Sequence, residues 1–362
     1  MKTVCVTKGY KQHTSSGGYG QLAEYLDAVE VRRSELTSVP ARVVEKAWNF
    51  CAGDKPYLES HLSHGYRFED RIVEERAFWL AQRLRAPIVH ALYGDWQLDL
   101  LLRRAALLPG RLVATFHLPA EAARDRFERA QKDLLARLDG AIVIASSQLA
   151  DYARWLGPEK VTVIPHGIDT AVFQPAPGER GATARFVFVG MAMRDFETAH
   201  RVVDLCARNG LDAEFDVVLP KASNPLFIGC DNVRLHSDIG ESQLIALYHG
   251  ADALFLPLLA ATANNAVLES LACGTPVIST AVGGVFDYVD ATCGWLLPPR
   301  DPAAAYACIE AIVRDRDLAS SKRRAARVKA ERFSWQRVAA EVTAAYDRLI
   351  SGTDFAACAQ SL

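Results

Sequence analysis

Short runs of apolar and β-branched residues alternate along this chain with longer stretches in which apolar residues recur every three or four positions. In the first half the runs are "KTVCVT" (2–7), "APIVHAL" (86–92), "RLVATFH" (111–117) and "AIVIAS" (141–146). Runs of this kind predict buried strands, and the stretches between them predict amphipathic helices. Because strand–helix alternation produces a parallel sheet covered by helices, we expect a doubly wound α/β domain.

The second half repeats this alternation. Its strand-like runs are "RFVFVG" (185–190), "EFDVVL" (214–219), "NVRLH" (232–236), "ALFLPLL" (253–259), "PVIST" (276–280) and "GWLLP" (294–298). Residues 168–183 contain two prolines and two glycines, which is typical of an interdomain linker. After a helical stretch at 331–350, the small and polar tail 351–362 is expected to be loosely held.

Composition supports two soluble domains. The chain has 362 residues, of which 50% are hydrophobic and 23% charged, and single cores rarely grow beyond about 250–300 residues. The formal charge of -2 gives no basic excess that would point to nucleic acid. The start "MKTVCVTKGY" lacks the apolar core of a signal peptide, and no run approaches the roughly 18 apolar residues of a membrane span.

The eight cysteines, at positions 5, 51, 206, 230, 273, 293, 308 and 358, are scattered and form no C-x-x-C pair. This distribution argues against a zinc site and against a disulfide framework, and it favours reduced thiols in a cytoplasmic protein. The single D-x-D, Asp315 to Asp317, lies in a charged helical segment, where it is expected to be solvated. No metal site is predicted.

Ligands of open parallel sheets bind beyond the carboxyl ends of the strands, so the loops after strands are the places to search. Gly17, Gly18 and Gly20 open a helix after the first strand, either as an anion-binding turn or as a plain turn. Their spacing is not that of a dinucleotide fingerprint. His117 ends a strand in "ATFHLP", where it is either functional or packed in the loop.

Two further loops stand in the second half. Arg194 follows the strand that ends at Gly190, and it is either a solvated surface residue or a planar fork for phosphate oxygens. In "TANNAVLESLACGTPVIST" (262–280), Asn264 or Asn265 can cap a helix and leave N–H groups facing outwards.

Gly274 and Pro276 end this helix. Glu269 lies off its apolar stripe, which consists of Val267, Leu268, Leu271 and Ala272. One interpretation of Glu269 is an acid near the helix start that interacts favourably with the helix dipole. The other is a carboxylate that accepts hydroxyl hydrogen bonds from a sugar or ribose.

Several segments of the chain resemble those of the retaining glycosyltransferases of family 4, which have the GT-B fold. "VTVIPHGIDTAVFQP" (161–175) is similar to their "VIPNGVD…F.P" stretch, and "ESLACGTPV" stands where their nucleotide-sugar signature has "EAMACG.PV". The segments "SSGGYGQLAEYL", "ATFHLP", "GGVFDYVD…GWLLPPRDPAA" and "RFSWQRV" extend the resemblance over nearly the whole chain.

The resemblance implies an α/β GT-B fold of two Rossmann-like doubly wound domains facing an interdomain cleft. Residues 1–167 would form the acceptor-side domain and 168–334 the nucleotide-sugar domain, with a C-terminal helix and tail, 335–362, packing back on the first. It also implies transfer of a sugar from a nucleotide-diphosphate sugar to a glycan, lipid or small-molecule hydroxyl, without metal or another cofactor. The expected location is cytoplasmic, with peripheral contact at the inner face of the membrane left open.

The same resemblance assigns roles to individual residues. Glu269 would hold the donor ribose, and His117 would lie near the transferring sugar. The diphosphate would contact Gly17 and Gly18 from one domain and, from the other, Arg194, Lys221 and the backbone amides around Asn264, Asn265 and Ala266. His117 and Arg194 are the catalytic candidates.

One departure concerns the sugar. The family signature has two glutamates eight residues apart, the earlier of which contacts the donor sugar, but Ala261 occupies that position and Ala260 precedes it. Either the donor is unusual, another residue substitutes, or activity is reduced or lost. The alternatives are therefore a catalytically impaired nucleotide-sugar-binding protein or partner subunit, and a GT-B epimerase or phosphorylase. The charged segment 121–140 is either solvated or in contact with anionic lipid.

Overall fold

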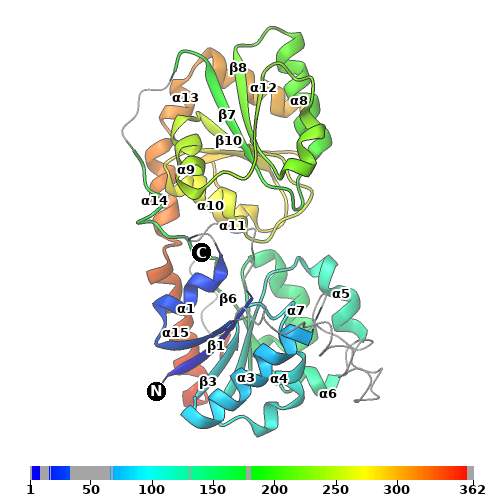
Figure 1. The fold of residues 1–362 in the computed structure, drawn as a ribbon, viewed down its shortest axis with the longest axis vertical. Coiled ribbons are helices and arrows are strands. Elements are labelled where there is room, and N and C mark those ends of the chain that lie inside the picture. Colours follow the sequence, from blue (N-terminus) through cyan, green and yellow to red (C-terminus); the bar gives the residue numbers. More distant parts are fainter. Residues whose placement is uncertain are drawn as a thin grey trace. The chain divides into compact units, whose positions relative to one another are not determined.

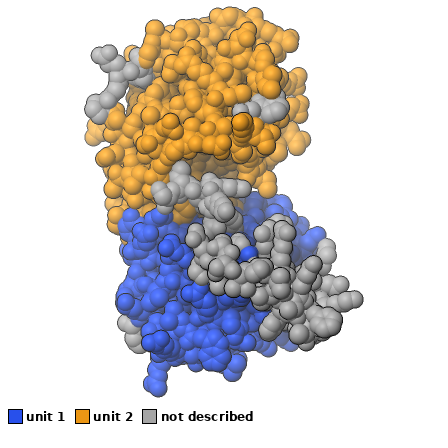
Figure 2. All heavy atoms as spheres, in the orientation of Figure 1, with its two compact units in different colours: residues 1–12, 19–165, 338–362 blue, residues 13–18, 166–337 orange. Residues whose placement is uncertain are grey.

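The computed structural model describes residues 2–8, 16, 18–32, 66, 68–129, 132–176 and 181–356. The chain divides into two compact units, coloured separately in Figure 2. Unit 1 comprises residues 1–12, 19–165 and 338–362, and unit 2 comprises residues 13–18 and 166–337. Each unit contains a parallel sheet with helices on its faces, so the predicted α/β class is confirmed (Figure 1).

Unit 1 is built from a sheet and the helices that connect its strands. Its strands are β1 (Thr3–Thr7), β2 (Ala28–Arg32), β3 (Ile88–Ala91), β4 (Arg111–Phe116), β5 (Gly140–Val143) and β6 (Val161–Val163). Its helices are η1 (Tyr19–Gln21), α1 (Leu22–Tyr25), α3 (Phe68–Leu84), α4 (Asp99–Arg103), η3 (Ala105–Leu107), α5 (Ala120–Arg129), α6 (Lys132–Leu135), η4 (Ser146–Gln148), α7 (Leu149–Leu156) and η5 (Pro158–Lys160). The last helix, α15 (Trp335–Ser351), begins in unit 2 and continues in unit 1.

The described strands of unit 1 form a parallel sheet in the order β2-β1-β3-β4-β5-β6. Strands β1, β3 and β5 are buried along their whole length, as expected where helices cover both faces of a parallel sheet. The strand order reverses direction between β1 and β3. Loops at such a switch point open a crevice, so this edge is the natural ligand side of unit 1.

The end of the chain is fastened to unit 1 by buried contacts. Tyr346 of α15 hydrogen-bonds Nδ1 of the buried His90 at 2.5 Å, and Thr115 Oγ1 lies 2.8 Å from its Nε2. Burial lowers the pKa of His90 to about 3, so the ring is neutral. Phe355 is buried against Gly140, so the expectation of a loose tail was wrong at this residue. Burying the large apolar area of this aromatic ring beside a glycine stabilises the end of the chain, which its small and polar neighbours cannot do.

Unit 2 contains the second sheet. Its strands are β7 (Ala184–Val189), β8 (Ala213–Val218), β9 (Val233–His236), β10 (Ala253–Leu256), β11 (Val277–Thr280) and β12 (Gly294–Leu297). Its helices are α8 (Phe196–Arg208), η6 (Lys221–Phe227), α9 (Glu241–Gly250), α10 (Asn265–Ala272), α11 (Val285–Tyr288), α12 (Pro302–Arg314), α13 (Asp317–Ser320) and α14 (Arg323–Glu331).

The described strands of unit 2 pair in parallel in the order β9-β8-β7-β10-β11-β12, which is the Rossmann order. The order reverses between β7 and β10, which places a ligand crevice at the carboxyl ends of these two strands. Ile168 and Phe173 are buried in the core of this unit. The interpretation of residues 168–183 as a linker was therefore wrong for these two positions. Their side chains belong to the core, although the residues around them are typical of turns.

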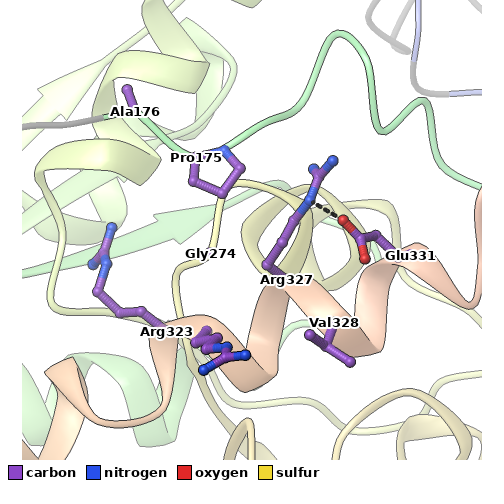
Figure 3. Close-up of a pocket in the computed structure, with 8 residues that line it drawn as sticks. Pro175, Ala176, Gly274, Arg323, Arg327, Val328 and Glu331 are labelled. Carbon is purple, nitrogen blue, oxygen red and sulfur yellow. Dashed lines mark hydrogen bonds and ion pairs between the residues drawn. The ribbon is translucent and has the colours of Figure 1, made fainter.

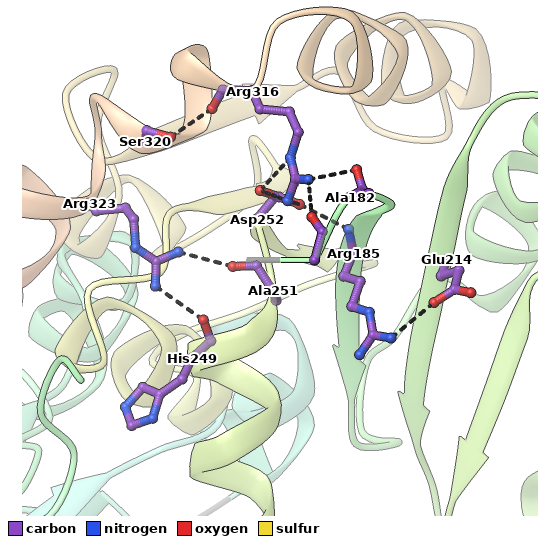
Figure 4. Close-up of polar contacts among 10 residues, drawn as sticks. Ala182, Arg185, Glu214, His249, Ala251, Asp252, Arg316, Ser320 and Arg323 are labelled. Carbon is purple, nitrogen blue, oxygen red and sulfur yellow. Dashed lines mark hydrogen bonds and ion pairs between the residues drawn. The ribbon is translucent and has the colours of Figure 1, made fainter. Parts of the chain in front are cut away.

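Two arginines of α14, Arg323 and Arg327, are hydrogen-bonded at the ends of two other helices; Figure 3 shows both side chains, and Figure 4 shows the bonds of Arg323. Arg323 donates to the carbonyl of Ala251 at 3.0 Å, beyond the end of α9, and Arg327 donates to that of Ala272 at 2.9 Å, at the end of α10. A cation at a helix carboxyl end also interacts favourably with the helix dipole. A pocket of about 270 Å³ beside these arginines contains none of the predicted site residues. Arg327 is already bonded to three backbone carbonyls, so we assign this region a structural role.

The D-x-D segment has a structural explanation as well. Asp315 and Asp317 are exposed, as predicted, whereas Arg316 between them turns inward to the buried Asp252 (Figure 4). Both carboxylate oxygens of Asp252 accept from Arg316 Nη2, at 2.8 and 2.6 Å, and Oδ1 also accepts from Arg316 Nε at 3.2 Å. The backbone N–H of Arg185 donates to Oδ2 as well.

The described ranges also contain cysteines, other side chains of the metal-ligating types, and long helices. No cluster of three or more His, Cys, Asp or Glu side chains that could hold a metal ion occurs there. The cysteines that are described there are free thiols. Among the described helices, none combines the length and the apolar character needed to cross a membrane.

Candidate functional site

The loops that follow β7 and β10 are joined at the switch point of unit 2. Arg194 and Leu258 form an antiparallel bridge, and the N–H of Leu259 donates to the carbonyl of Met193 at 2.9 Å. The second of these loops leads directly into α10. The backbone around Arg194 is therefore fixed relative to the start of α10, in the crevice where Rossmann folds bind nucleotides.

The guanidinium of Arg194 is partly used by its own loop. Its Nε and Nη2 donate to the carbonyl of Val189 at 3.0 and 2.8 Å, and its Nη1 donates to that of Ala192 at 2.7 Å. Gly190 has φ +85°, and a Cβ there would stand 2.9 Å from Nη2, so glycine permits this close approach. A guanidinium has five N–H donors. One hydrogen on each terminal nitrogen of Arg194 therefore remains for a ligand.

Arg194 keeps its charge at neutral pH, although burial lowers its pKa to about 10. The side chain is half-buried and ordered by its own backbone. The interpretation of Arg194 as a freely solvated surface residue does not fit this environment.

Helix α10 begins and ends as its local sequence predicts. Asn264 is the N-cap, and its side chain accepts from the N–H of Ala266 at 3.1 Å. The first intrahelical bond runs from Leu268 N to Asn264 O, so the N–H groups of the first turn, with the positive end of the helix dipole, lie at the switch point. The cap already uses the N–H of Ala266, one of the predicted diphosphate contacts. Gly274, with φ +73°, ends the helix.

Glu269 is buried, contrary to its expected position off the apolar stripe. Every residue from Ala266 to Ala272 is buried, so α10 is covered on all sides, and only 4% of Glu269 is exposed. Its Oε2 accepts from the hydroxyl of Tyr248 at 2.8 Å. Burial raises the pKa of Glu269 to about 7; the Tyr248 bond lowers this pKa, Glu241 raises it and Arg194 lowers it. A buried carboxylate of this kind is not a surface acid placed for the helix dipole.

The loop before α10 carries Ala261 at the position where the family signature has its earlier glutamate. Ala261 is buried, and its carbonyl accepts from the N–H of Gly284 at 2.9 Å. The backbone of this loop is therefore held by the glycine pair at 283–284. No side-chain acid occurs between Pro257 and Asn264.

We expect Gly283→Ala to disturb this loop. Gly283 has φ +49°, and an added Cβ would lie 2.2 Å from the carbonyl oxygen of Ala261. Backbone strain and this clash should lower the free energy of unfolding by about 1–3 kcal/mol and weaken ligand binding at the start of α10. Thermal melts and nucleotide titration would measure both effects. Gly250→Ala, where a Cβ meets open space, is the control, and equal effects in the two variants would contradict this explanation.

The remaining predicted diphosphate contacts are Lys221, Gly17 and Gly18. Lys221 is exposed at the start of η6, two residues after Leu219. Gly17 lies outside the described residues, and Gly18 is half-buried. Their neighbour Ser16 is hydrogen-bonded to Glu241 of α9 through its N–H at 3.0 Å and through its hydroxyl at 3.1 Å.

His117 of unit 1 is held by the loop after β3. Its Nε2 donates to the carbonyl of Leu92 at 2.8 Å, so this nitrogen carries the proton, and its backbone N–H donates to Asp95 at 2.5 Å. The ring stacks on Tyr93 with 4.9 Å between centroids. Burial raises the pKa of Asp95 to about 6. His117 is thus packed in its loop, half-buried, at the carboxyl edge of the sheet. Its catalytic role stays a prediction.

Two residues with clear roles in these sites were not found from the sequence. Tyr248 lies in an apolar helix, "ESQLIALYHG" (241–250), where an aromatic residue is typical of a core position. Asp95 follows a strand but has no spacing that marks it. Both act through contacts with residues more than 20 positions away, for which a single sequence carries no signal.

Comparison with known families gives two matches. The family described as "Glycosyl transferases group 1" matches residues 180–315, and the family described as "Glycosyltransferase Family 4" matches residues 53–172. The first match contains Arg194, Lys221 and α10, and the second contains His117. Both units are therefore covered in part by glycosyltransferase families.

Related proteins agree with these matches. A D-inositol 3-phosphate glycosyltransferase of Streptomyces avermitilis is 26% identical over an alignment that covers 90% of this chain and 74% of the relative. An MMP alpha-(1->4)-mannosyltransferase of Mycolicibacterium hassiacum is 28% identical, covering 57% of this chain and 52% of the relative.

Solved structures show the same fold. Sucrose-phosphate synthase of Thermosynechococcus elongatus has a TM-score of 0.70 at 19% identity, covering 98% of this chain and 100% of that one. HepE of Anabaena, solved in complex with UDP and glucose, has a TM-score of 0.69 at 13% identity, covering 96% and 99%. These likenesses support the GT-B fold, with two Rossmann-like domains.

Proposed function

Because this chain belongs to glycosyltransferase family 4 and has the GT-B fold, we propose that it transfers a sugar, with retention, from a nucleotide-diphosphate sugar to an acceptor hydroxyl. The observation that carries this proposal is the arrangement at the switch point of unit 2. Three groups lie there in adjoining segments: the buried carboxylate of Glu269, the guanidinium of Arg194 with two free hydrogens, and the capped start of α10.

Each of these groups suits one part of the donor. Tyr248 donates to Oε2 of Glu269, so Oε1 would accept from the ribose hydroxyls. Hydrogen bonds to a charged acceptor contribute about 1.5–3 kcal/mol each. The start of α10 offers the positive end of a helix dipole to the diphosphate. The two remaining hydrogens of Arg194 would donate to the same diphosphate oxygens.

In the proposed reaction the acceptor hydroxyl attacks the anomeric carbon on the face that the nucleoside diphosphate leaves. The bond from this carbon to the diphosphate oxygen breaks, negative charge grows on the leaving diphosphate, and one of its oxygens takes the hydroxyl proton. Preorganised donors aimed at such charge contribute about 3–4 kcal/mol each, which is the role we assign to Arg194 and the first turn of α10. We propose that the positive charge of Arg194 and of the start of α10 makes a metal ion unnecessary. His117 of unit 1 would be the second catalytic residue, as the resemblance to the family implies.

The acceptor is proposed more broadly, as a glycan, lipid or small-molecule hydroxyl. The name of the Streptomyces relative mentions D-inositol 3-phosphate, so phosphorylated cyclitols belong in the first acceptor panel. A thermal-shift screen of UDP, GDP, ADP and their sugars, followed by transfer assays, tests the proposal, since a ligand that binds the folded state raises the melting temperature. Absence of binding by every one of these nucleotides would contradict it.

A second candidate follows from Ala261. The loop before α10 has no acid to hold the donor sugar, which favours a nucleotide-sugar-binding protein with impaired turnover. Binding of a nucleotide sugar without nucleoside diphosphate release, over the whole acceptor panel, would support this candidate. Release that depends on an acceptor would support the transferase.

We expect nucleotide-sugar affinity to rise as pH increases from about 6 to about 8.5. The pKa of Glu269 is raised to about 7, so the carboxylate that accepts the ribose hydroxyls forms over this range. A nucleotide sugar is the right probe because its diphosphate is esterified at both ends and does not titrate near neutral pH. Calorimetric titration with UDP-glucose and GDP-mannose measures the profile. A flat profile in Glu269→Gln is predicted, and the same slope in that variant would count against the assignment.

A further inference from the structure

Tyr248 contacts the candidate ribose carboxylate with its hydroxyl. The side chain is fully buried on α9, and its Oη donates to Oε2 of Glu269 at 2.8 Å. A phenol has a single hydrogen to donate, so this donor is committed to Glu269. None of the described residues hydrogen-bonds Oε1 of Glu269. The two carboxylate oxygens therefore have different surroundings: Oε2 is bonded to Tyr248, and Oε1 has no hydrogen bond from the described residues.

The backbone of Tyr248 is hydrogen-bonded to the turn at the C-terminal end of α10, the helix that carries Glu269. Thr275, in the turn that ends α10, donates from its hydroxyl to the carbonyl of Tyr248 at 2.7 Å. Arg323 donates to the carbonyl of Ala251, three residues further along, at 3.0 Å (Figure 4). Tyr248 is thus attached to the segment of α10 at two points, through Glu269 and through Thr275. A residue held in this way leaves Glu269 little freedom to rotate.

We propose that Tyr248 is a positioning residue for nucleotide binding, which holds Oε2 of Glu269 so that Oε1 accepts the ribose hydroxyls. This inference rests on the proposed function, because it needs a ribose at Glu269. It adds a residue outside the motif that carries Glu269, contributed by a different helix 21 positions earlier in the chain. Tyr248 acts through Glu269 and is not assigned a contact with the ligand.

Tyr248 also affects the ionisation of Glu269. The titratable and charged groups that face this carboxyl are Tyr248 and Glu241 of α9, Arg194 after β7, and Cys273 at the end of α10. Burial raises the pKa of Glu269 to about 7, and hydrogen-bond donation from Tyr248 opposes that rise. Without the hydroxyl, the pKa moves above 7 and the carboxylate forms at higher pH.

The test compares Tyr248→Phe with the wild-type chain in titrations with UDP, GDP and ADP and with their 2′,3′-dideoxy forms. We expect the variant to bind the ribonucleotide roughly tenfold more weakly at pH 7 and to lose most of its preference over the dideoxy form. The difference in affinity should shrink as pH rises to about 9. In Glu269→Gln, adding Tyr248→Phe should change affinity less than twofold, since the hydroxyl acts through the carboxylate.

Tyr306→Phe is the matched control, because Tyr306 also donates to a glutamate, Glu310, at 3.2 Å in the same unit. It removes a tyrosine–glutamate hydrogen bond away from α10 and should leave affinity unchanged. If Tyr248→Phe keeps the wild-type affinity, ribose preference and pH profile, the positioning role is overturned while the proposed function stands. If it weakens ribo and dideoxy forms equally at every pH, its role is structural only. If the wild-type chain binds none of the nucleotides, the proposed function itself fails.

Discussion

Replacing Glu269 with alanine is expected to weaken nucleoside diphosphate binding by roughly 10- to 100-fold. The substitution removes the carboxylate to which we assign the ribose hydroxyls and leaves the buried hydroxyl of Tyr248 without its acceptor. Titration calorimetry with UDP, GDP and ADP measures the loss. The matched control is Glu310→Ala, which also removes a glutamate that accepts from a tyrosine. Unchanged affinity in Glu269→Ala would contradict the ribose role.

The conservative change Glu269→Gln separates function from stability. The pKa of this acid is about 7 in the folded chain and about 4.5 as a free side chain, so ionisation destabilises the fold as pH rises through this range. At pH 8 the neutral glutamine, which still accepts from Tyr248, should raise stability by on the order of 1–3 kcal/mol while weakening nucleotide binding. Such opposite signs are expected of a functional carboxylate. A fall in both quantities would indicate a structural one.

Replacing Arg194 with alanine is expected to lower turnover by about 100- to 1,000-fold. The variant loses the two guanidinium hydrogens that we assign to the leaving diphosphate, and it also leaves the carbonyls of Val189 and Ala192 without their donor. Lysine at this position keeps the charge but cannot hold the loop and the ligand together, so we expect an intermediate rate. The measurement is the initial rate of nucleoside diphosphate release at saturating donor.

Arg185→Ala provides the control for this experiment. Arg185 lies on β7, in the strand that precedes Arg194, and its side chain pairs with Glu214 at 3.3 Å (Figure 4). Its loss should leave turnover within about twofold, because surface ion pairs contribute about 0–1 kcal/mol. A rate in Arg194→Ala within threefold of the wild-type rate would remove Arg194 from the proposed mechanism.

The fold could be predicted from the sequence because its main determinant is local. In both halves, β-branched runs such as "RLVATFH" and "RFVFVG" alternate with helical stretches, and this alternation specifies parallel sheets without knowledge of any long-range contact. The ends of α10 could be predicted for the same reason. Asn264 and Gly274 act on their own neighbours, the first as the N-cap and the second with a positive φ.

Burial of individual side chains was less predictable. Glu269 was expected off the buried stripe of α10, but the helix is covered on every side, and a stripe argument cannot show what packs against the second face. Ile168, Phe173 and Phe355 lie among turn or tail residues and are nevertheless buried. Their partners come from distant segments, so neither their surroundings nor their spacing indicates a core position.

The details of the candidate site depend on long-range contacts in the same way. The resemblance drew attention to Arg194 and Glu269, but not to the carbonyls that use three of the N–H donors of Arg194. It also did not identify Tyr248, whose hydroxyl meets Glu269 only because α9 and α10 are packed together. Pairing of this kind is a property of the folded chain and has no counterpart in a single motif.

The central claim is that the ribose of a nucleoside diphosphate lies on Glu269, at the switch point between β7 and β10. A crystal structure of the full chain grown with UDP, GDP or ADP tests it most directly. We predict ribose hydroxyls within hydrogen-bond distance of Oε1 of Glu269, with the diphosphate at the start of α10 and beside Arg194. A nucleotide bound elsewhere on the chain, or one whose ribose makes no contact with Glu269, would contradict the account.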